Sequence, residues 1–187
     1  MAAIVVLAAG GVGLYFLLRP SESTPAAPAT SDTPTASTTT TPTTPAAVAQ
    51  ARLFGQLPAG YLPGVCRPTA PPERALAQVA CDQNVDPDGP PAATYTLYPD
   101  VTTLRSAFDR AVPASAVIIC PGRIQSPGPW HHVASPDKPS GMVLCAAPQG
   151  NPSLTWTNEA ELMLSTVQAS VPGPTIDQLF AWWSSHS

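Results

Sequence analysis

The first 50 residues leave no room for a globular core, because they consist of an apolar run followed by a tract rich in Pro and Thr. Residues 2–18 carry no charge, and their only strongly hydrogen-bonding side chain is that of Tyr15. As a helix rising about 1.5 Å per residue, this run reaches roughly 25 Å, slightly less than a hydrocarbon core of about 30 Å. Local thinning of the bilayer, with Tyr15 and Arg19 at the interface, accommodates that length. We therefore expect residues 1–19 to form a transmembrane helix.

A cleaved signal peptide is the alternative interpretation of this run. Signal peptides begin with a basic segment, whereas here only Met1 precedes the apolar residues. The lack of Lys or Arg before the run is also unusual for a membrane helix that starts in the cytoplasm. Either a cytoplasmic part precedes Met1 in a longer protein, or the start is genuine and its amine is the only charge on that side.

Residues 20–52 are interpreted as a disordered stalk. Up to about residue 50 the composition is almost wholly Pro, Thr, Ser and Ala, including four consecutive threonines at 38–41. Such a tract has too few large apolar side chains to offset the entropy lost on ordering. Its prolines favour extended conformers of about 3.1 Å per residue, so the stalk reaches on the order of 100 Å. A plain spacer is the expected role, and O-glycosylation of the Ser and Thr residues is an additional hypothesis.

Residues 53–187 are expected to form one α+β domain, with a mainly antiparallel sheet and two packed helices on one face. Asp100 is the predicted N-cap of a helix over 101–112, and Thr175 with Gln178 forms a capping box that starts a second helix. Residues 121–141 are rich in Pro and Gly and are predicted to be a loop. Alternating apolar residues predict strands at 75–81, 93–98, 142–146, 154–157 and 162–168, with a brief buried run at 117–120.

Four cysteines, Cys66, Cys81, Cys120 and Cys145, all lie in this domain. An even number beyond an apolar span and a stalk is typical of an oxidising, extracytoplasmic compartment. Of the three connectivities, the local one, Cys66–Cys81 with Cys120–Cys145, closes loops of roughly 15 and 25 residues, each worth about 3 to 3.5 kcal/mol in the chain-entropy model. A four-cysteine zinc site is the alternative, but it usually needs closely spaced pairs such as C-x-x-C, which the chain lacks. We expect disulfides, and therefore a domain outside the cytoplasm.

The composition argues against several function classes. Only 11% of the 187 residues are charged and the net charge is −4, so no basic surface is expected for nucleic acid or anionic lipid. The chain contains no G-x-S-x-G, no H-E-x-x-H and no glycine-rich phosphate loop. With all cysteines paired, no thiol nucleophile remains. We expect no catalytic residue, cofactor or metal. A hydrolase with an unrecognised site stays as an alternative, which a solvent-filled cleft lined by His131, Asp109 or Glu161 would support.

Several polar residues are interpreted as structural and not as binding or catalytic sites. Residues 84–89 resemble the first half of an EF-hand loop, but Tyr95 stands where a bidentate Glu is required, so a plain turn is expected. Glu159 and Glu161 are expected to be solvated in an exposed turn. His186 is expected in a frayed C-terminus.

The tryptophans give the best candidates for ligand contact. Trp156 and Trp183 are expected in the core, and so is Trp130, although it precedes the loop residues His131 and His132. Trp182 falls at the edge of the apolar stripe of its helix and is expected to be exposed. The candidate ligand contacts are Trp130, His131 and Trp182.

The pattern W-H-H at 130–132, G-M-V-L-C at 141–145, L-T-W-T at 154–157 and L-F-A-W-W at 179–183 resembles actinobacterial, mycobacterial-type single-pass membrane proteins. In those proteins a domain with this Trp and Cys spacing follows one span and a Pro/Thr linker. Some are membrane-anchored serine/threonine protein kinases with the kinase domain inside the cell, and others have no kinase. The resemblance covers roughly residues 60–187 and implies a non-catalytic sensor or envelope-binding module. It transfers no catalytic residue, and this chain has no kinase motif.

Together these observations predict a single-pass membrane protein whose C-terminal domain senses or binds material of the cell envelope. The alternative is an envelope scaffold without a signalling role. The expected partner is an envelope ligand or another membrane protein. Gly10, Gly11 and Gly13 would let two anchors pack closely, so a homodimer is a further hypothesis. An in-frame kinase domain upstream of Met1 would favour sensing, and a stop codon there would favour the scaffold.

Overall fold

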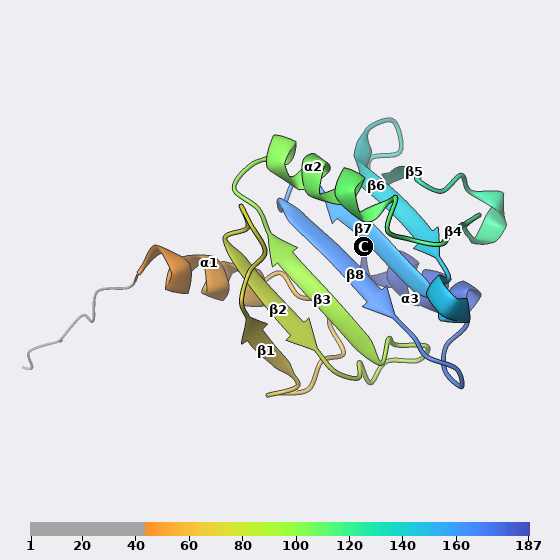
Figure 1. Cartoon of the computed structure of the whole chain (residues 1–187), viewed down its shortest axis with the longest axis horizontal. Helices are drawn as coiled ribbons and strands as arrows, with labels where there is room; N and C mark the ends of the chain where they lie inside the picture. The colour runs from red at the N-terminus through yellow and green to blue at the C-terminus, as the bar shows by residue number, and fades with distance from the viewer. Residues whose placement is uncertain (1–43) are drawn as a thin grey trace, which may run out of the picture. The chain divides into compact units, whose positions relative to one another are not determined.

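The computed structural model describes residues 44–187, which form an α+β domain with an eight-stranded antiparallel sheet, three helices and two disulfides (Figure 1). The strand order is β1-β2-β3-β8-β7-β6-β4, and β5 also pairs with β6. The predicted transmembrane helix and most of the predicted stalk lie outside the described residues. Between residues 44 and 187, no helix combines the length and apolar character needed to cross a bilayer.

The elements follow the local patterns of the sequence in most places. The strands are β1 Cys66–Thr69, β2 Ala77–Cys81, β3 Ala92–Leu97, β4 Val117–Ile118, β5 Gly128–His131, β6 Pro139–Ala146, β7 Ser153–Asn158 and β8 Met163–Gln168. The helices are α1 Pro45–Phe54, α2 Val101–Ala111 and α3 Ile176–His186, with short 3-10 turns η1 Pro121–Arg123 and η2 Pro148–Gly150. The five predicted strands are confirmed as β2, β3, β6, β7 and β8. Strand β5 corrects the prediction of a continuous loop over 121–141.

The helices lie on both faces of the sheet, so the prediction of helices on one face is wrong. Tyr95 and Leu97 of β3 point into the larger core, to which α1 and α3 contribute. Tyr98, just after β3, joins Leu104 and Ala107 of α2 in a second, smaller cluster. Figure 1 shows α2 in front of the sheet and α3 behind it. The central strands carry apolar side chains on both faces, and each face therefore needs a helical cover.

Helix α1 corrects the boundary between the stalk and the domain. Residues 45–52, assigned to the disordered stalk, belong to this helix. Thr44 caps it by accepting a hydrogen bond from the Ala47 amide (3.2 Å), and Pro45 occupies the first turn. Ala49 and Leu53 are buried in the larger core. Because four of its ten residues are Ala, the helix resembles an extension of the low-complexity tract in sequence, although Ala is the strongest helix former.

Both predicted helix starts are confirmed. The Asp100 carboxylate accepts a hydrogen bond from the Thr103 amide (2.8 Å), and the same bond lowers the pKa of Asp100. Thr175 and Gln178 form the reciprocal capping box that begins α3.

The cysteines form the two predicted disulfides, Cys66–Cys81 and Cys120–Cys145, so the zinc alternative is excluded. Cys66 and Cys81 are opposite each other in the β1–β2 pair. Cys120 precedes η1, and its bond to Cys145 ties that segment to β6. Two disulfides in a domain of this size are typical of an extracytoplasmic setting.

Candidate functional site

The segment between β4 and β5, residues 119–127, is tethered firmly to β6. The Cys120–Cys145 disulfide fixes its start. Near its end, the Ser126 hydroxyl accepts a hydrogen bond from the Cys145 amide (2.8 Å) and donates one to the Cys145 carbonyl oxygen (3.2 Å). Within the segment, the Cys120 amide donates to the Ile124 carbonyl oxygen (3.1 Å). The backbone of this segment is thus held at both ends by the same strand residue.

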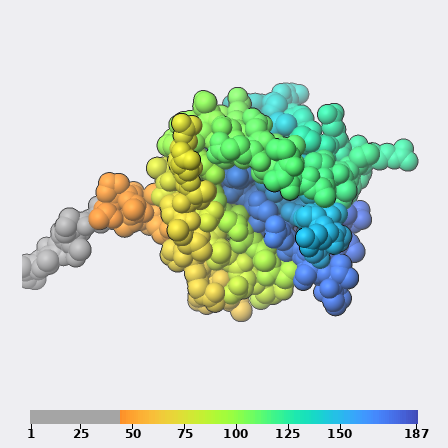
Figure 2. Space-filling model, viewed as in Figure 1, coloured from red at the N-terminus to blue at the C-terminus, as the bar shows by residue number. Residues whose placement is uncertain are grey.

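This tethered segment and the following turn expose large apolar side chains. The exposed fraction is 70% for Ile119, 40% for Ile124 and 93% for Val133. We call these three residues the apolar tip. In Figures 1 and 2 this part of the chain lies at the end of the domain remote from α1, and residues near 120 project from its surface. Ile124 and Val133 line one hollow, and exposed apolar side chains that share a surface in this way mark interaction sites.

A hollow on the α3 side of β5 has a volume of about 440 Å³. Trp130 forms part of its wall, and its indole N–H donates to the Thr157 carbonyl oxygen (2.8 Å). The Trp130 ring meets Trp183 edge-to-face with centroids 5.6 Å apart, and Trp183 packs against Phe180. His131 and two residues of the apolar tip, Ile124 and Val133, complete much of the rim. This hollow, the α3-side hollow, therefore offers an aromatic wall beside an exposed apolar rim.

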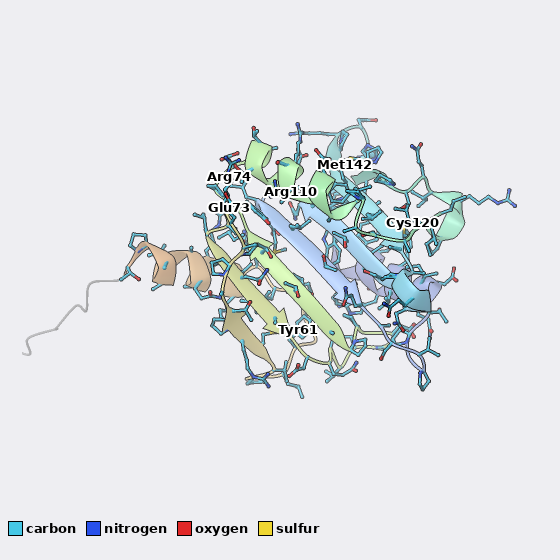
Figure 3. The ribbon with its side chains drawn as sticks, viewed as in Figure 1. Tyr61, Glu73, Arg74, Arg110, Cys120 and Met142 are labelled. Atoms are coloured by element: carbon cyan, nitrogen blue, oxygen red, sulfur yellow. A yellow bond between two sulfur atoms is a disulfide. The ribbon has the colours of Figure 1, made fainter. Side chains whose placement is uncertain are left out.

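A second hollow, of about 530 Å³, lies between α2 and the β5–β6 hairpin. We call it the α2-side hollow. Pro129 lines both hollows, so they flank β5. Figure 3 shows Met142, on β6, beside α2 at this place. The Arg105 guanidinium makes two hydrogen bonds to the Glu159 carboxylate (2.7 and 2.8 Å), which raise the pKa of Arg105. Asp109 and Lys138 also line this hollow.

The structure brings two of the three candidate contact residues together. Trp130 and His131 line the α3-side hollow, where Trp130 is largely buried and His131 is exposed. Trp182 is only 2% exposed, so the expectation of an exposed side chain is wrong. The His186 ring stacks on it with centroids 4.6 Å apart. His186 is in turn bonded to Asp86, so the expectation of a frayed C-terminus is also wrong.

The two glutamates of the β7–β8 turn are not freely solvated, in contrast to the prediction. Glu159 is paired with Arg105. Glu161 is partly buried, and burial raises its pKa while the nearby Arg52 opposes the shift. Asn158 donates a hydrogen bond to the Glu161 carboxylate (2.9 Å).

The groups that would have supported a hydrolase are not assembled in one place. His131 lies in the α3-side hollow and Asp109 in the α2-side hollow, whereas Glu161 lines neither of the two. Residues 84–89 form the predicted turn, in which the side-chain amide of the buried Asn84 donates a hydrogen bond to the Ala59 carbonyl oxygen (2.8 Å). Across the described range 44–187, no group of three or more His, Cys, Asp or Glu side chains is arranged to hold a metal ion.

Sequence reasoning missed the apolar tip and Lys138. These residues lie in or beside the Pro/Gly-rich stretch that was predicted to be a loop. Ile119 was expected in the buried run at 117–120, and this expectation is wrong because its side chain is 70% exposed. For Ile124 and Val133 the available signal was their isolation in the Pro/Gly-rich stretch, where nothing in the local pattern provides a buried face for them. Comparison of this chain with protein-family models, with curated proteins and with solved structures finds no match.

Proposed function

We propose that this protein is a non-catalytic binding module of the cell envelope, anchored in the membrane by residues 1–19 and carrying its folded domain outside the cytoplasm. The observation that carries this proposal is the exposed apolar tip, in which Ile119 and Ile124 lie on a backbone tethered by Cys120 and Ser126. A flexible loop could turn such side chains inward, whereas a tethered one holds them in solvent.

The energetics of this arrangement favour a binding role. Full burial of an Ile or Val side chain is worth about 1.5 to 3 kcal/mol, which the domain alone leaves unrealised at Ile119 and Val133. Ordering a side chain at an interface costs about 0.5 to 1.5 kcal/mol. β-branched side chains on a fixed backbone have little of that freedom left to lose. The surface is therefore pre-organised for a partner with an apolar contact region.

The position of the apolar tip supports contact with material at a distance from the membrane. The predicted stalk precedes α1 in the sequence, and the segment between β4 and β6 that carries the apolar tip lies at the end of the domain remote from α1 (Figure 1). A Pro-rich tract before α1 would lift the domain away from the bilayer. The two disulfides support an oxidising compartment for this half of the chain.

A sensor is our preferred form of this function, and a scaffold without signalling is the second candidate. The resemblance to actinobacterial membrane proteins with intracellular kinase domains supports the sensor. So do Gly10 and Gly13, which would permit two anchors to associate. In a membrane-helix association assay of the full chain, Gly10→Leu with Gly13→Leu should weaken self-association. Unchanged association would remove the dimer from the proposal.

Retention on the cell envelope tests the binding role. We would express the full chain in its own organism, dissolve the membranes in detergent and measure the fraction that sediments with the cell wall. The variant Ile119→Ser/Val133→Ser should be retained about tenfold less, because the loss of about 1.4 kcal/mol corresponds to that factor. The matched control Leu62→Ser/Val171→Ser alters two other exposed apolar residues and should behave like the unmodified chain. Equal retention of both variants would contradict the proposal.

A further inference from the structure

We propose that the α2-side hollow binds a short peptide with a free amine, a free carboxylate and an apolar side chain. This inference rests on the proposed binding function and names a ligand class for one of the two hollows beside β5.

The floor of the hollow is apolar. Phe108 of α2 is almost fully buried there, and Met142 of β6 lies beside it, with Pro129 and Pro139 of the hairpin on the other side. Arg105, Phe108 and Asp109 are spaced i, i+3 and i+4 along α2, so one helix face presents all three toward the hollow. An apolar side chain of a ligand would be buried against this floor.

The charges on the rim are balanced, and one of each sign is left without a partner. Arg105 and Glu159 neutralise each other through their two hydrogen bonds. Asp109 and Lys138 form no ion pair with any other residue in the range 44–187. They come from different walls, Asp109 from α2 and Lys138 from the turn before β6. A ligand that carries only one charge would match one wall and leave the other unmatched, whereas a zwitterion matches both.

The strand wall of the hollow is rigid. The Met142 amide donates to the Thr157 hydroxyl (2.9 Å), and the Trp130 indole donates to the Thr157 carbonyl oxygen (2.8 Å). Gly141 sits so close to Thr157 that a Cβ at this position would overlap the Thr157 carbonyl oxygen. These contacts fix the backbone between the two walls, so the charged side chains project from a pre-organised frame.

The size of the hollow suits a dipeptide or tripeptide. Its volume of about 530 Å³ falls within the range of about 300 to 1,000 Å³ found for small-ligand sites. An acyl chain would fit the floor, but it would remove water from Asp109 and Lys138 without replacing their hydrogen bonds, which is unfavourable.

Calorimetric titration of the purified, detergent-solubilised full chain with the dipeptide Leu-Phe tests the inference. We expect binding of the free dipeptide and at least about tenfold weaker binding of its N-acetyl and C-amide forms, because each cap removes one charge-assisted hydrogen bond. Asp109→Asn should abolish the discrimination against the N-acetyl form only. Lys138→Gln should abolish the discrimination against the amide only. The matched controls Asp177→Asn and Arg123→Gln alter exposed charges outside the hollow and should change neither.

The outcomes separate this inference from the proposed function. If Leu-Phe does not bind, or if its capped forms bind equally well, the peptide assignment is wrong, whatever the envelope assay gives. Binding that is unaltered by both Asp109→Asn and Lys138→Gln would also overturn it. The envelope assay of the Ile119→Ser/Val133→Ser variant alone decides the role of the apolar tip, because those residues do not line the α2-side hollow.

Discussion

His186 Nε2 lies 2.9 Å from Asp86 Oδ2, which joins the end of α3 to the turn before β3 across 100 positions of sequence. The other ring nitrogen, Nδ1, donates to the Trp182 carbonyl oxygen at 2.7 Å. Both ring nitrogens therefore lie within hydrogen-bond distance of an oxygen atom. Gln178 adds a second link to the same turn by donating to Asp88 (2.7 Å). These bonds hold α3 over the larger core and fix Trp183 in the wall of the α3-side hollow.

Replacement of His186 should destabilise the domain. His186→Ala removes the bond to Asp86 and uncovers Trp182, so we expect the free energy of unfolding to fall by about 1 to 3 kcal/mol in urea titrations. His131→Ala is the matched control, because His131 is exposed and should change stability by less than about 0.5 kcal/mol. Equal effects of the two substitutions would show that the contact of His186 with Asp86 contributes nothing.

The buried pair Tyr61 and Tyr95 should make the domain sensitive to alkali. Their hydroxyl oxygens lie 2.8 Å apart. Burial raises the pKa of Tyr61 to about 12 and shifts the pKa of Tyr95 further upward. The folded state thus holds these protons more tightly than the unfolded state, in which tyrosine has a pKa of about 10. The free energy of unfolding should be unaffected by this pair below about pH 10 and should fall as the pH rises toward 12.

Absorbance at 295 nm and unfolding measurements at pH 8 and pH 11 check this sign. The double variant Tyr61→Phe/Tyr95→Phe should lose less stability between these two pH values than the unmodified domain. If the folded domain shows both tyrosines ionising near pH 10, the attribution to burial is wrong.

Leu53 tests whether α1 belongs to the folded domain. Its side chain is fully buried in the larger core, so Leu53→Ala should lower the free energy of unfolding by about 2 to 5 kcal/mol. Val48, on the exposed side of the same helix, supplies the control Val48→Ala, for which a change below about 0.5 kcal/mol is expected. A small effect at both positions would mean that residues 45–54 belong to the stalk and not to the folded domain.

The two disulfides should differ in their effect on binding. Removal of either bond, as Cys66→Ser/Cys81→Ser or as Cys120→Ser/Cys145→Ser, should cost about 2 to 5 kcal/mol of stability. Only the second pair anchors the segment that carries Ile119 and Ile124. The envelope-retention assay is run at a temperature below the unfolding transition of both variants. Under this condition, the loss of the Cys120–Cys145 disulfide should reduce retention. An equal reduction by both variants would contradict the role of the tether.

Elements with a local signal could be predicted from the sequence. Strand β3 shows its alternation of apolar and polar residues within six positions. The N-caps Asp100 and Thr175 lie directly before α2 and α3, so the start of each helix can be recognised from a few neighbouring residues. Strands β1 and β5 could not be recognised in this way. Each is four residues long and contains Pro, and each becomes a strand only through its neighbour in the sheet.

The candidate site was predictable only in part. Trp130 and His131 are adjacent in sequence and stand out as a pair. Asp109 and Lys138 lie on α2 and near β6, and only the pairing of β5 with β6 beneath α2 brings them to one hollow. The burial of Trp182 could not be predicted from the sequence. His186 stacks on Trp182 and is held in place by Asp86, which is 100 positions away in the chain.

The placement of the folded domain, residues 45–187, outside the cytoplasm is the claim on which the proposed function depends. Its most direct test is mass spectrometry of the full chain taken from its own organism, with thiols alkylated at the moment of lysis. The account predicts peptides linked as Cys66–Cys81 and Cys120–Cys145 with no alkylated cysteine. Alkylation at all four cysteines would contradict it, because the domain would then reside in a reducing compartment.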